Sequence, residues 1–571
     1  MGQDGRLHLI DAGIKHLPNL AVKAKHIYMK KLLLALLCLP SLAGGQTTMG
    51  LIQHSSGSND DGYVLFAPIT YTTTYLINKC GRLMHSWNSS YKPSQSVYIL
   101  PDGTLLRPGN AGNANFTAGG TGGIIEKLAW DGTVLWNYTV SDTAQCQHHD
   151  IKQLPNGNIL AIMWELRSPA NAIAAGRNPS LLGASLWSEK IIELQPSGTN
   201  TAAIVWEWHV WDHLVQDYDN SKPSFGAVNS SPQLVNINYA ATTQADWLHF
   251  NSVDYNPALD QVMISNHNFN EIWVIDHSTT TMQAAGHAGG SSGKGGDLLY
   301  RWGNPAAYNN GTATDQKLWG QHNAHWIESG LPDAGKIMIF NNGHGLPAAT
   351  NYSSVEIIDP PVNTAGVYTA TLPYLPSSAS WSYTSTVTTD FFATNISGAQ
   401  QLANGNVLIC SGPTGTFFEI DGAKTTVWEY INPVKNTGPM TQGSTPAQNA
   451  VFRCSFYPFN YSGFTGHSLI AGVPIEINPT AYSCDLTEVG DLIKEDISVS
   501  PNPATDKLSI TSHTGNIGDI KLYNAMGQLV LQQSQAPYSC TVDLSEVPSG
   551  FFYMSLLHNN KMTVQKLVVV K

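Results

Sequence analysis

The chain has 571 residues, 12% of them charged and 42% hydrophobic, with a formal net charge of −12. Its length exceeds one ordinary domain, and the acidic balance without basic runs argues against nucleic acid as a partner. A polar surface of Asn, Ser, Thr and Gly, together with 15 tryptophans, is typical of a β-rich secreted protein with many turns.

The N-terminal region carries an export signal. A basic pair, a short apolar run and small residues (KKLLLALLCLPSLAGG) predict a signal peptide over 29–45. Ala43 and Gly45 fit the −3 and −1 positions, so the mature chain is expected to start near Gln46. Residues 1–28 have no role in this scheme and are interpreted as a non-native extension. A buried N-terminal helix is the alternative. The apolar run is too short to span a bilayer, and no transmembrane segment is expected in the mature form.

From about residue 60 to 435 the sequence repeats one pattern. Each unit has a strand, a tight turn, a second strand and later strands that carry Ile-Ile-Glu-like or tryptophan-bearing motifs. The turns are LPDGTLL (100–106), LPNGNIL (154–160), NPALDQVMI (256–264), LPDAGKIMI (331–339) and LANGNVLI (402–409). Asp-Gly or Asn-Gly between apolar runs indicates a hairpin. Six such units predict an all-β fold, a six-bladed β-propeller over 46–435 with a central channel. An open array of β-sandwiches is the alternative.

Three long inserts interrupt the repeat, at 165–188, 209–247 and 285–320. We expect them to form loops on one rim, where binding residues commonly lie. Residues 436–485 are rich in Gly, Pro and Asn, and we expect them to form a strap packed on the propeller.

Six cysteines remain after Cys38 of the signal peptide, and an exported protein can pair them. Cys454 and Cys484 bracket a Pro/Gly-rich loop segment and are the pair that we expect to form a bridge. The sequence leaves the pairing open.

Residues 486–571 predict a small all-β domain, an Ig-like β-sandwich. Its motifs PNP, LYNAMGQLV, SGFFYMSL and the final KLVVVK closely resemble the C-terminal sorting domain of the Bacteroidetes type IX secretion system. This resemblance implies passage across the outer membrane with the type IX machinery as partner, and a secreted or cell-surface location. It implies nothing about chemistry.

Aligning the units on their turns reveals candidate channel residues. Five positions before the aligned turn residue lie Gln95, His149, His322 and Ser397, and His249 falls within about one residue of that register. Since the innermost strand of a blade begins at the channel, these side chains are expected to point into one pocket. Imidazoles held close together can exchange a proton or accept a group. The alternative is that the histidines only hydrogen-bond the starts of the strands.

Further candidates surround this register. Arg301 is expected either to face the channel and bind an anion or to form a salt bridge on the rim. Asn sites can orient an oxyanion, although Asn-Asn-Gly is also ordinary turn chemistry. The candidate binding residues are Asn251, His267, His325, Asn341, His344 and Ser397. Three imidazoles would also suit zinc or copper, but no carboxylate-rich cluster or tight H-x-H pattern accompanies them, so no metal is expected.

Several motifs, in order along the chain, resemble the arylsulfotransferase family over roughly residues 60–460. They are DWLHFNSVDYNPALDQVMISNHNFNEIWVID, LLYRWGNPAAY, LWGQHNAHW, IMIFNNG and SGAQQLANGNVLICSGPTGTFFEID. The resemblance implies an exported six-bladed propeller that uses no nucleotide sulfate donor. It also implies transfer of a sulfuryl group from a phenolic sulfate to a phenol through a sulfated histidine.

The resemblance also implies roles for single residues. His249 and His322 match histidines of the family's pocket and would bind the sulfate. The family's arginine after its FDNG-like motif is missing here, and Arg301 is the candidate substitute. The family's sulfated histidine lies further along, but this chain has none between His344 and His467, and Ser397 occupies the channel position of the sixth unit.

We therefore expect an exported arylsulfotransferase-like enzyme in which His149, His249 or His322 serves as acceptor or base. No cofactor is expected, and donor and acceptor remain open. The alternative is a non-catalytic propeller that binds a glycan, peptide or surface polymer through the rim residues Trp187, Trp211 and Trp247. A metal-dependent oxidase or lyase is a third hypothesis.

Overall fold

The structure is a computed structural model. It describes residues 47–55, 57, 62–240, 243–347, 350–480, 484, 497–512, 515–524, 528–558 and 561–571. The predicted signal peptide and N-terminal extension lie outside the described residues. No helix among the described residues is long and apolar enough to cross a membrane.

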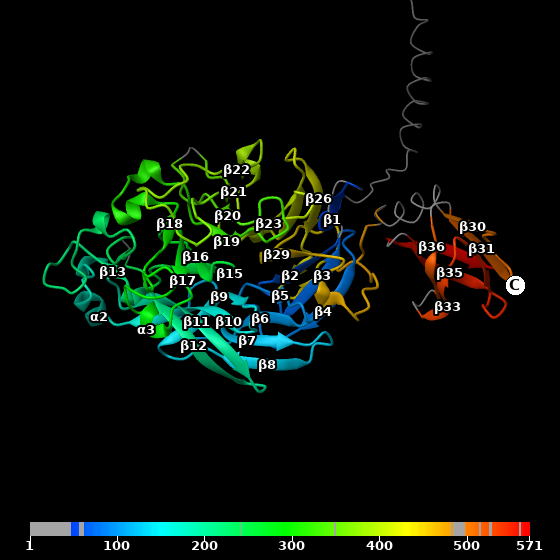
Figure 1. Cartoon of the computed structure of the whole chain (residues 1–571), viewed down its shortest axis with the longest axis horizontal. Coiled ribbons are helices and arrows are strands. Elements are labelled where there is room, and N and C mark those ends of the chain that lie inside the picture. The colour runs from blue at the N-terminus through cyan, green and yellow to red at the C-terminus, as the bar shows by residue number, and fades with distance from the viewer. Residues whose placement is uncertain are drawn as a thin grey trace, which may run out of the picture. The chain divides into compact units, whose positions relative to one another are not determined.

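Six antiparallel sheets form the blades of a propeller (Figure 1), which confirms the predicted fold class. From the innermost strand outward they are β29 (Val451–Pro458), β2 (Gly62–Pro68), β3 (Thr73–Asn78) and β4 (Leu83–Asn88); β5 (Tyr98–Ile99), β6 (Leu105–Asn110), β7 (Gly123–Leu128) and β8 (Val134–Thr139); β9 (Gln145–Gln153), β10 (Ile159–Arg167), β11 (Leu186–Ser197) and β12 (Thr201–His209); β15 (Phe250–Asn256), β16 (Gln261–Asn266), β17 (Glu271–Asp276) and β18 (Tyr300–Trp302); β19 (His322–Trp326), β20 (Ile337–Asn341), β21 (Ser354–Ile358) and β22 (Trp381–Tyr383); and β23 (Gly398–Gln401), β24 (Val407–Ser411), β25 (Thr416–Ile420) and β26 (Thr426–Ile431).

The turns predicted from the sequence join the first two strands of their blades. Gly157 sits in the β9–β10 turn with φ 86° and Gly405 in the β23–β24 turn with φ 87°. A β-carbon is strained in this left-handed region, which explains glycine at both positions. Apolar residues of neighbouring blades then pack face to face; in one cluster, Leu160 and Ile162 of the third blade lie with Val262 and Ile264 of the fourth.

Two strands distant in sequence close the ring. Strand β29 pairs with β2 and so completes the first blade from the inside, as Figure 1 shows by the yellow strand beside the blue ones. Strand β1 (Gly50–His54) pairs with β26 and adds a fifth, outermost strand to the sixth blade. The expectation that 436–485 is a strap packed on a complete propeller is therefore wrong for residues 451–458, which are an innermost strand of the propeller itself.

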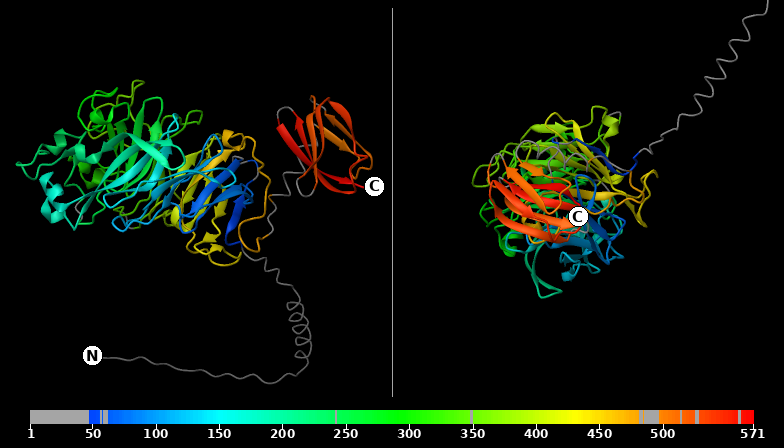
Figure 2. Two further views of the ribbon diagram at one scale, coloured as in Figure 1. Left: turned by 90° about the horizontal axis from the view of Figure 1, so that it is seen from below. Right: turned by 90° about the vertical axis from the view of Figure 1, so that its right-hand side faces the viewer.

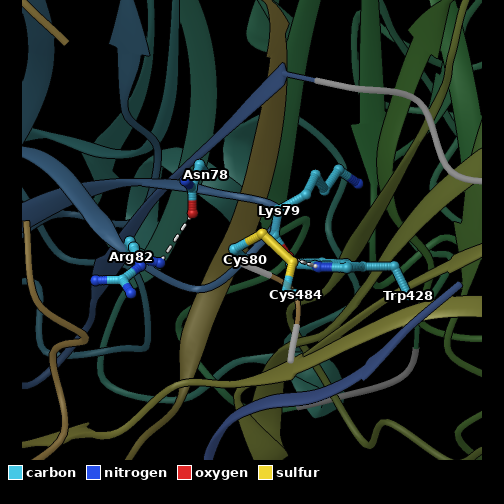
Figure 3. Close-up of a disulfide and its surroundings, with 6 residues drawn as sticks. All are labelled: Asn78, Lys79, Cys80, Arg82, Trp428 and Cys484. Atoms are coloured by element: carbon cyan, nitrogen blue, oxygen red, sulfur yellow. Dashed lines mark hydrogen bonds between the residues drawn. A yellow bond between two sulfur atoms is a disulfide. The ribbon is translucent and has the colours of Figure 1, made fainter. Parts of the chain in front are cut away.

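The cysteine pair that we expected is also wrong. Cys80, in the turn after β3, is bonded to Cys484, whereas Cys454 is a buried free thiol in β29. Figure 3 shows the bridge beside Trp428, whose indole Nε1 donates to the carbonyl of Lys79 at 2.7 Å. On the other side, the backbone N–H of Arg82 donates to Asn78 Oδ1 at 2.9 Å and fixes the turn. Cys454 instead contacts the side chain of Cys410.

The inserts form a packed layer of short elements on the third and fourth blades. A two-stranded parallel pair lies there, β13 (Leu214–Val215) with β14 (Val235–Asn236), together with α2 (Pro169–Ala174) and α3 (Thr281–Ala284). Ser168 caps α2 and Pro169 occupies its first turn, as the missing N–H of proline allows.

The short 3₁₀ turns of the described residues are η1 (Pro179–Leu181), η2 (Val210–Asp212), η3 (Val228–Ser230), η4 (Pro305–Tyr308), η5 (Ala313–Asp315), η6 (Thr388–Asp390), η7 (Gly412–Thr414) and η8 (Ser462–Phe464). A small ladder, β27 (Val434–Lys435) with β28 (Gly438–Pro439), follows the sixth blade.

The C-terminal strands, orange to red in Figure 2, form the β-sandwich predicted for this part of the chain. One sheet contains β30 (Ile497–Ser500), β31 (Lys507–Ser512) and β34 (Ser539–Asp543); the other contains β33 (Leu529–Ala536), β32 (Gly518–Asn524), β35 (Gly550–His558) and β36 (Lys561–Val569). Alternate residues of both sheets, among them Leu508, Ile510, Phe552 and Met554, build its core.

Candidate active site

The innermost strands share one backbone irregularity. Gln95, His149, His249, Asn323 and Ser397 all have left-handed φ angles, between 52° and 87°. Non-glycine residues rarely adopt this region, so its return in five blades marks a structural repeat rather than chance. Four of these residues belong to the register identified from the turns. In the fifth blade the left-handed residue is Asn323, one position after His322.

Four imidazoles from three blades form a continuous series. The ring centroids of His149 and His249 lie 4.6 Å apart, those of His249 and His267 5.2 Å, and those of His267 and His322 5.4 Å. Phe452 of β29 lies 6.1 Å from the His149 ring and 6.3 Å from the His322 ring. The structure therefore brings His149, His249, His267 and His322 together at the start of the channel.

His149 is connected to a buried carboxylate through its sequence neighbour. His149 Nδ1 lies 2.8 Å from His148 Nδ1, and His148 Nε2 lies 2.7 Å from Glu189 Oε2 of β11. Trp164 of β10 stacks on the His148 ring at 3.8 Å with planes 5° apart, and the N–H of Phe250 donates to Glu189 Oε1 at 3.0 Å. The order Glu189, His148, His149 resembles the carboxylate–imidazole–nucleophile order of a catalytic triad.

The three residues Glu189, His148 and His149 form a hydrogen-bonded relay, and burial sets their protonation. It raises the pKa of the Glu189 carboxyl well above its ordinary value, and the nearby Asp246 adds to the rise. Burial and the positive charge of His249 hold the pKa of His148 and of His149 well below the usual range. Both imidazoles are therefore held in the neutral form, and Glu189, when ionised, is a stronger proton acceptor than an exposed carboxylate.

A glycine lies directly over the His149 ring. The backbone N–H of His149 donates to the carbonyl of Gly120 at 2.9 Å, and a β-carbon on Gly120 would come within 2.4 Å of three ring atoms. The loop can approach this closely only because Gly120, with φ 85°, has no side chain. His149 is 2% exposed under this cover.

His249 has the opposite electrostatic setting. Its Nδ1 lies 2.5 Å from Asp246 Oδ2, and Trp164 Nε1 donates to Asp246 Oδ1 at 3.1 Å. Burial lowers the pKa of His249, but the charge and hydrogen bond of Asp246 outweigh it, and the net shift is upward. With its side chain 18% exposed, His249 is the cationic member of the series.

His322 and His267 are held as neutral rings. His322 Nδ1 lies 2.8 Å from Asn342 Oδ1, and its Nε2 accepts the N–H of Ile396 at 3.2 Å, which specifies the tautomer. Burial, and next to it the neighbouring His267, hold the pKa of His322 well below its usual range. Burial and the charge of His249 lower the pKa of His267 to about 4. His322 therefore anchors the entry to the sixth blade.

An ion pair joins the innermost strands near the histidines. Arg453, the neighbour of Phe452 in β29, places Nη2 3.0 Å from Asp150 Oδ2 and Nη1 3.3 Å from the hydroxyl of Tyr98. The same Nη2 lies 3.5 Å from the carbonyl of Asn251. This guanidinium joins the first, second, third and fourth blades, and the sequence did not single it out.

The structure does not place Arg301 among the histidines. Arg301 is on β18, the outermost strand of the fourth blade, and both its Nε and Nη2 bond Glu271. Its Nη1 donates to the carbonyl of Pro232 at 3.1 Å. Of the two interpretations of this arginine, the salt bridge is the one found, although it is buried rather than on the rim.

Three other candidates have structural hydrogen bonds. Asn341 Oδ1 accepts the N–H of Trp319 at 2.8 Å, and Ser397 Oγ accepts the N–H of Gly412 at 2.9 Å. Asn251 Nδ2 donates to the Gln321 carbonyl at 2.7 Å. The Asn341 bond ties the end of β20 to the loop before β19, and the Ser397 bond ties the segment before β23 to the residue after β24.

His325 and His344 do not belong to the imidazole series. His325, three residues further along β19, contacts the carbonyl of Asn323 at 2.9 Å and lies near the ion pair of Lys152 with Asp254. His344 is exposed in the loop after β20, close to Gly320. Neither joins the contacts of His149.

Sequence reasoning missed three residues that support the histidines, namely His148, Glu189 and Asp246. Two signals were present: the doublet His148-His149, and an aspartate three residues before His249 in DWLH. Glu189 carries no local signal, because it reaches His148 from another strand.

Comparison with known proteins agrees with this architecture. Fold and site define an all-β propeller with a histidine-lined channel and a separate C-terminal sandwich. The sequence profile described as Arylsulfotransferase (ASST) matches residues 106–448, more than half of the chain. The chain therefore belongs to the arylsulfotransferase family. The profile described as Secretion system C-terminal sorting domain matches residues 498–570, and the protein is exported to the cell surface or the medium.

No curated protein matches the chain. Similar solved structures include a Bacteroides caccae protein of unknown function, 11% identical, covering 69% of this chain and 98% of its own, with a TM-score of 0.36. Virginiamycin B lyase from Staphylococcus aureus is 12% identical, covering 69% and 86%, with a TM-score of 0.30. These TM-scores are too low to support a conclusion.

Proposed function

We propose that this exported protein transfers a sulfuryl group from a phenolic sulfate to a phenol, with His149 Nε2 as the covalent acceptor. The observation that carries the proposal is the Glu189–His148–His149 relay, which occupies Nδ1 of His149, with the His149 ring 4.6 Å from the ring of the cationic His249. Membership of the arylsulfotransferase family supports the reaction class.

The first half-reaction breaks the ester S–O bond and forms an N–S bond to His149. As Nε2 donates its electron pair to sulfur, Nδ1 passes its proton to His148, and His148 passes its own Nε2 proton to Glu189. The raised pKa of Glu189 suits it to receive this proton. The N-sulfated imidazole thus has no ring proton at Nδ1, and Glu189 holds that proton as a neutral carboxylic acid.

His249 completes the proton balance. As an imidazolium, it attracts the sulfate oxygens and then protonates the departing phenolate. In the second half-reaction the neutral His249 removes the proton of the acceptor phenol, whose oxygen attacks sulfur. The N–S bond breaks with its electron pair returning to Nε2 of His149, while Glu189 returns its proton to His148 and His148 passes its own to Nδ1 of His149. The two half-reactions form a ping-pong cycle without an external cofactor.

This assignment would account for the departure from the family pattern in the sixth unit. Ser397 stands where the resemblance implies a sulfated histidine, and its hydroxyl is engaged by the N–H of Gly412 and the carbonyl of Asn395. The acceptor would then come from the equivalent left-handed position of the third blade, His149.

The positions of the three rim tryptophans do not favour the alternative of a non-catalytic binding surface. Trp187 and Trp247 are buried, Trp187 against Phe116 and Trp164. Trp211 is half-buried beneath Arg167, whose guanidinium lies 4.8 Å from its ring.

The test is a single turnover with 4-nitrophenyl sulfate and no acceptor. We expect a burst of nitrophenol equal to the enzyme and one sulfuryl adduct, which peptide mapping places on His149. His149→Ala should lose both, whereas His325→Ala, changed on the innermost strand of another blade, should keep both. An adduct on a different residue, or a full burst from His149→Ala, would exclude His149 as acceptor.

A further inference from the structure

Three metal-ligating side chains meet in the rim inserts, away from the channel. His213 Nδ1 lies 2.9 Å and His287 Nδ1 2.7 Å from the same oxygen, Asp297 Oδ1. The three ligand atoms all lie within 4.8 Å of one another. His213 is buried, Asp297 nearly so, and His287 is 61% exposed.

The hydrogen bond of the second ring nitrogen of His213 indicates which tautomer the ring adopts. Nε2 lies 2.8 Å from the carbonyl of Ala284, which can only accept, so Nε2 carries the hydrogen. A neutral His213 therefore directs the lone pair of Nδ1 at a carboxylate oxygen. Two acceptors at 2.9 Å repel unless a proton or a metal cation lies between them. Metal-binding histidines typically donate their other N–H to a carbonyl in this way.

The two buried ligands are held rigidly. Trp208 stacks on the His213 ring at 5.7 Å with planes 9° apart, and its Nε1 donates to the carbonyl of Gly296 at 2.7 Å. A β-carbon on Gly296 would lie 2.0 Å from the Ala284 carbonyl and 2.6 Å from His213 Nε2. Glycine before Asp297 thus permits the close packing that fixes carbonyl, imidazole and carboxylate together.

An open cleft adjoins the exposed ligand. It has a volume of about 680 Å³ and is lined by His287, Asp212, Trp211 and residues of α2 such as Asn171. A cation bound by His213, His287 and Asp297 would have its remaining coordination position next to this cleft. Three protein ligands with one open position are the pattern of reactive rather than structural zinc sites.

We propose that His213, His287 and Asp297 bind one Zn²⁺ ion, with the open position available to water or to an anionic ligand in the cleft. Two imidazoles and one carboxylate suit zinc in both ligand type and number. The site is independent of the sulfuryl-transfer proposal and of the channel histidines.

The full-length protein, stripped with a chelator under non-reducing conditions, should be titrated with Zn²⁺ alone by calorimetry. We expect one equivalent, and X-ray absorption should show two imidazoles among nitrogen and oxygen ligands. His287→Ala changes an exposed side chain and should weaken binding at least tenfold without loss of fold. Asp297→Asn should do the same. The matched controls His344→Ala, an exposed loop histidine, and His267→Ala, in the channel, should keep the affinity of the parent protein.

Absence of zinc binding would overturn the proposal. Equal affinity in His287→Ala and the parent, or loss of binding in His267→Ala, would also overturn it by placing the ion elsewhere.

Discussion

The Nδ1 atoms of His148 and His149 lie 2.8 Å apart although the residues are neighbours in a strand. Successive side chains of a regular strand point to opposite faces. Here φ of His149 is 52°, inside an irregular stretch of the β9–β10 pairing between Ala161 and Met163. The left-handed residue turns the second imidazole back toward the first. A backbone irregularity of one blade thereby produces the relay on which the proposed chemistry depends.

Replacing Glu189 by Gln should slow turnover of 4-nitrophenyl sulfate by roughly 10²-fold, the usual contribution of a proton acceptor. The amide has nearly the same shape but cannot take the proton that His148 passes on. Single-turnover kinetics would show a slower burst with the adduct still on His149. Glu207→Gln, on the neighbouring strand β12 and outside the relay, is the control and should leave the burst unchanged. An unaltered rate in Glu189→Gln would contradict a role in proton transfer.

Gly120→Ala should abolish the burst, because its β-carbon would overlap the His149 ring at 2.2 Å. Gly112→Ala is the matched control in the same loop: its φ is 75° but nothing lies within 4 Å of the added carbon. Both variants carry backbone strain of about 1 kcal/mol. Thermal unfolding and activity, measured together, separate strain from displacement of the ring. Equal activity of the two variants would show that the Gly120 contact is unimportant.

Asp246→Asn should move the alkaline limb of the pH–rate profile to lower pH. Asp246 raises the pKa of His249, so His249 stays protonated above the ordinary histidine range. The associated stability is fully present below about pH 6.5 and is lost as pH rises through the pKa of folded His249. Without the carboxylate, the imidazolium of His249 should lose its proton at a lower pH. The pH profile of kcat/KM for donor cleavage tests this. An alkaline limb at the same pH in Asp246→Asn and the parent would contradict the role of His249 as proton donor.

His267→Gln should reduce the acid sensitivity of the propeller. The folded pKa of His267 is about 4, below its unfolded value, so unfolding takes up a proton between about pH 6.5 and 4. Stability contributed by this group is present above pH 6.5 and falls on acidification by up to about 1.4 kcal/mol per pH unit. Urea unfolding at several pH values should show a shallower dependence in His267→Gln. His344→Gln, an exposed histidine, should retain the parent slope.

Reduction of the Cys80–Cys484 bridge should lower the unfolding free energy by about 2–5 kcal/mol, because it closes a loop across nearly the whole propeller. Thiol titration of the denatured, unreduced mature chain should detect Cys146, Cys410, Cys454 and Cys540 as free. Cys80→Ser should reproduce the effect of reduction, whereas Cys540→Ser should not. A protected Cys454 together with a free Cys80 would instead support the pairing expected from sequence.

The sequence by itself determined the repeat, the fold class and the export tail. Turn glycines such as Gly157 and Gly405, together with apolar alternation, encode hairpins within a few residues, so the blades follow from local pattern. The turn register also selected His149 and His249, because each occupies the same left-handed position of its blade. In the fifth blade that register selected His322, whereas the left-handed residue is Asn323.

Only the tertiary structure decided which distant residues meet. Strand β29 enters the first blade and Cys484 bonds Cys80 because ring closure joins the two ends of the repeat, and no local pattern records that pairing. Arg301 was expected near sulfate, yet its strand lies outermost, where Glu271 neutralises it. Glu189 reaches His148 from another strand. A one-residue irregularity reverses the direction of a side chain, so the relay depends on backbone geometry that strand periodicity does not specify.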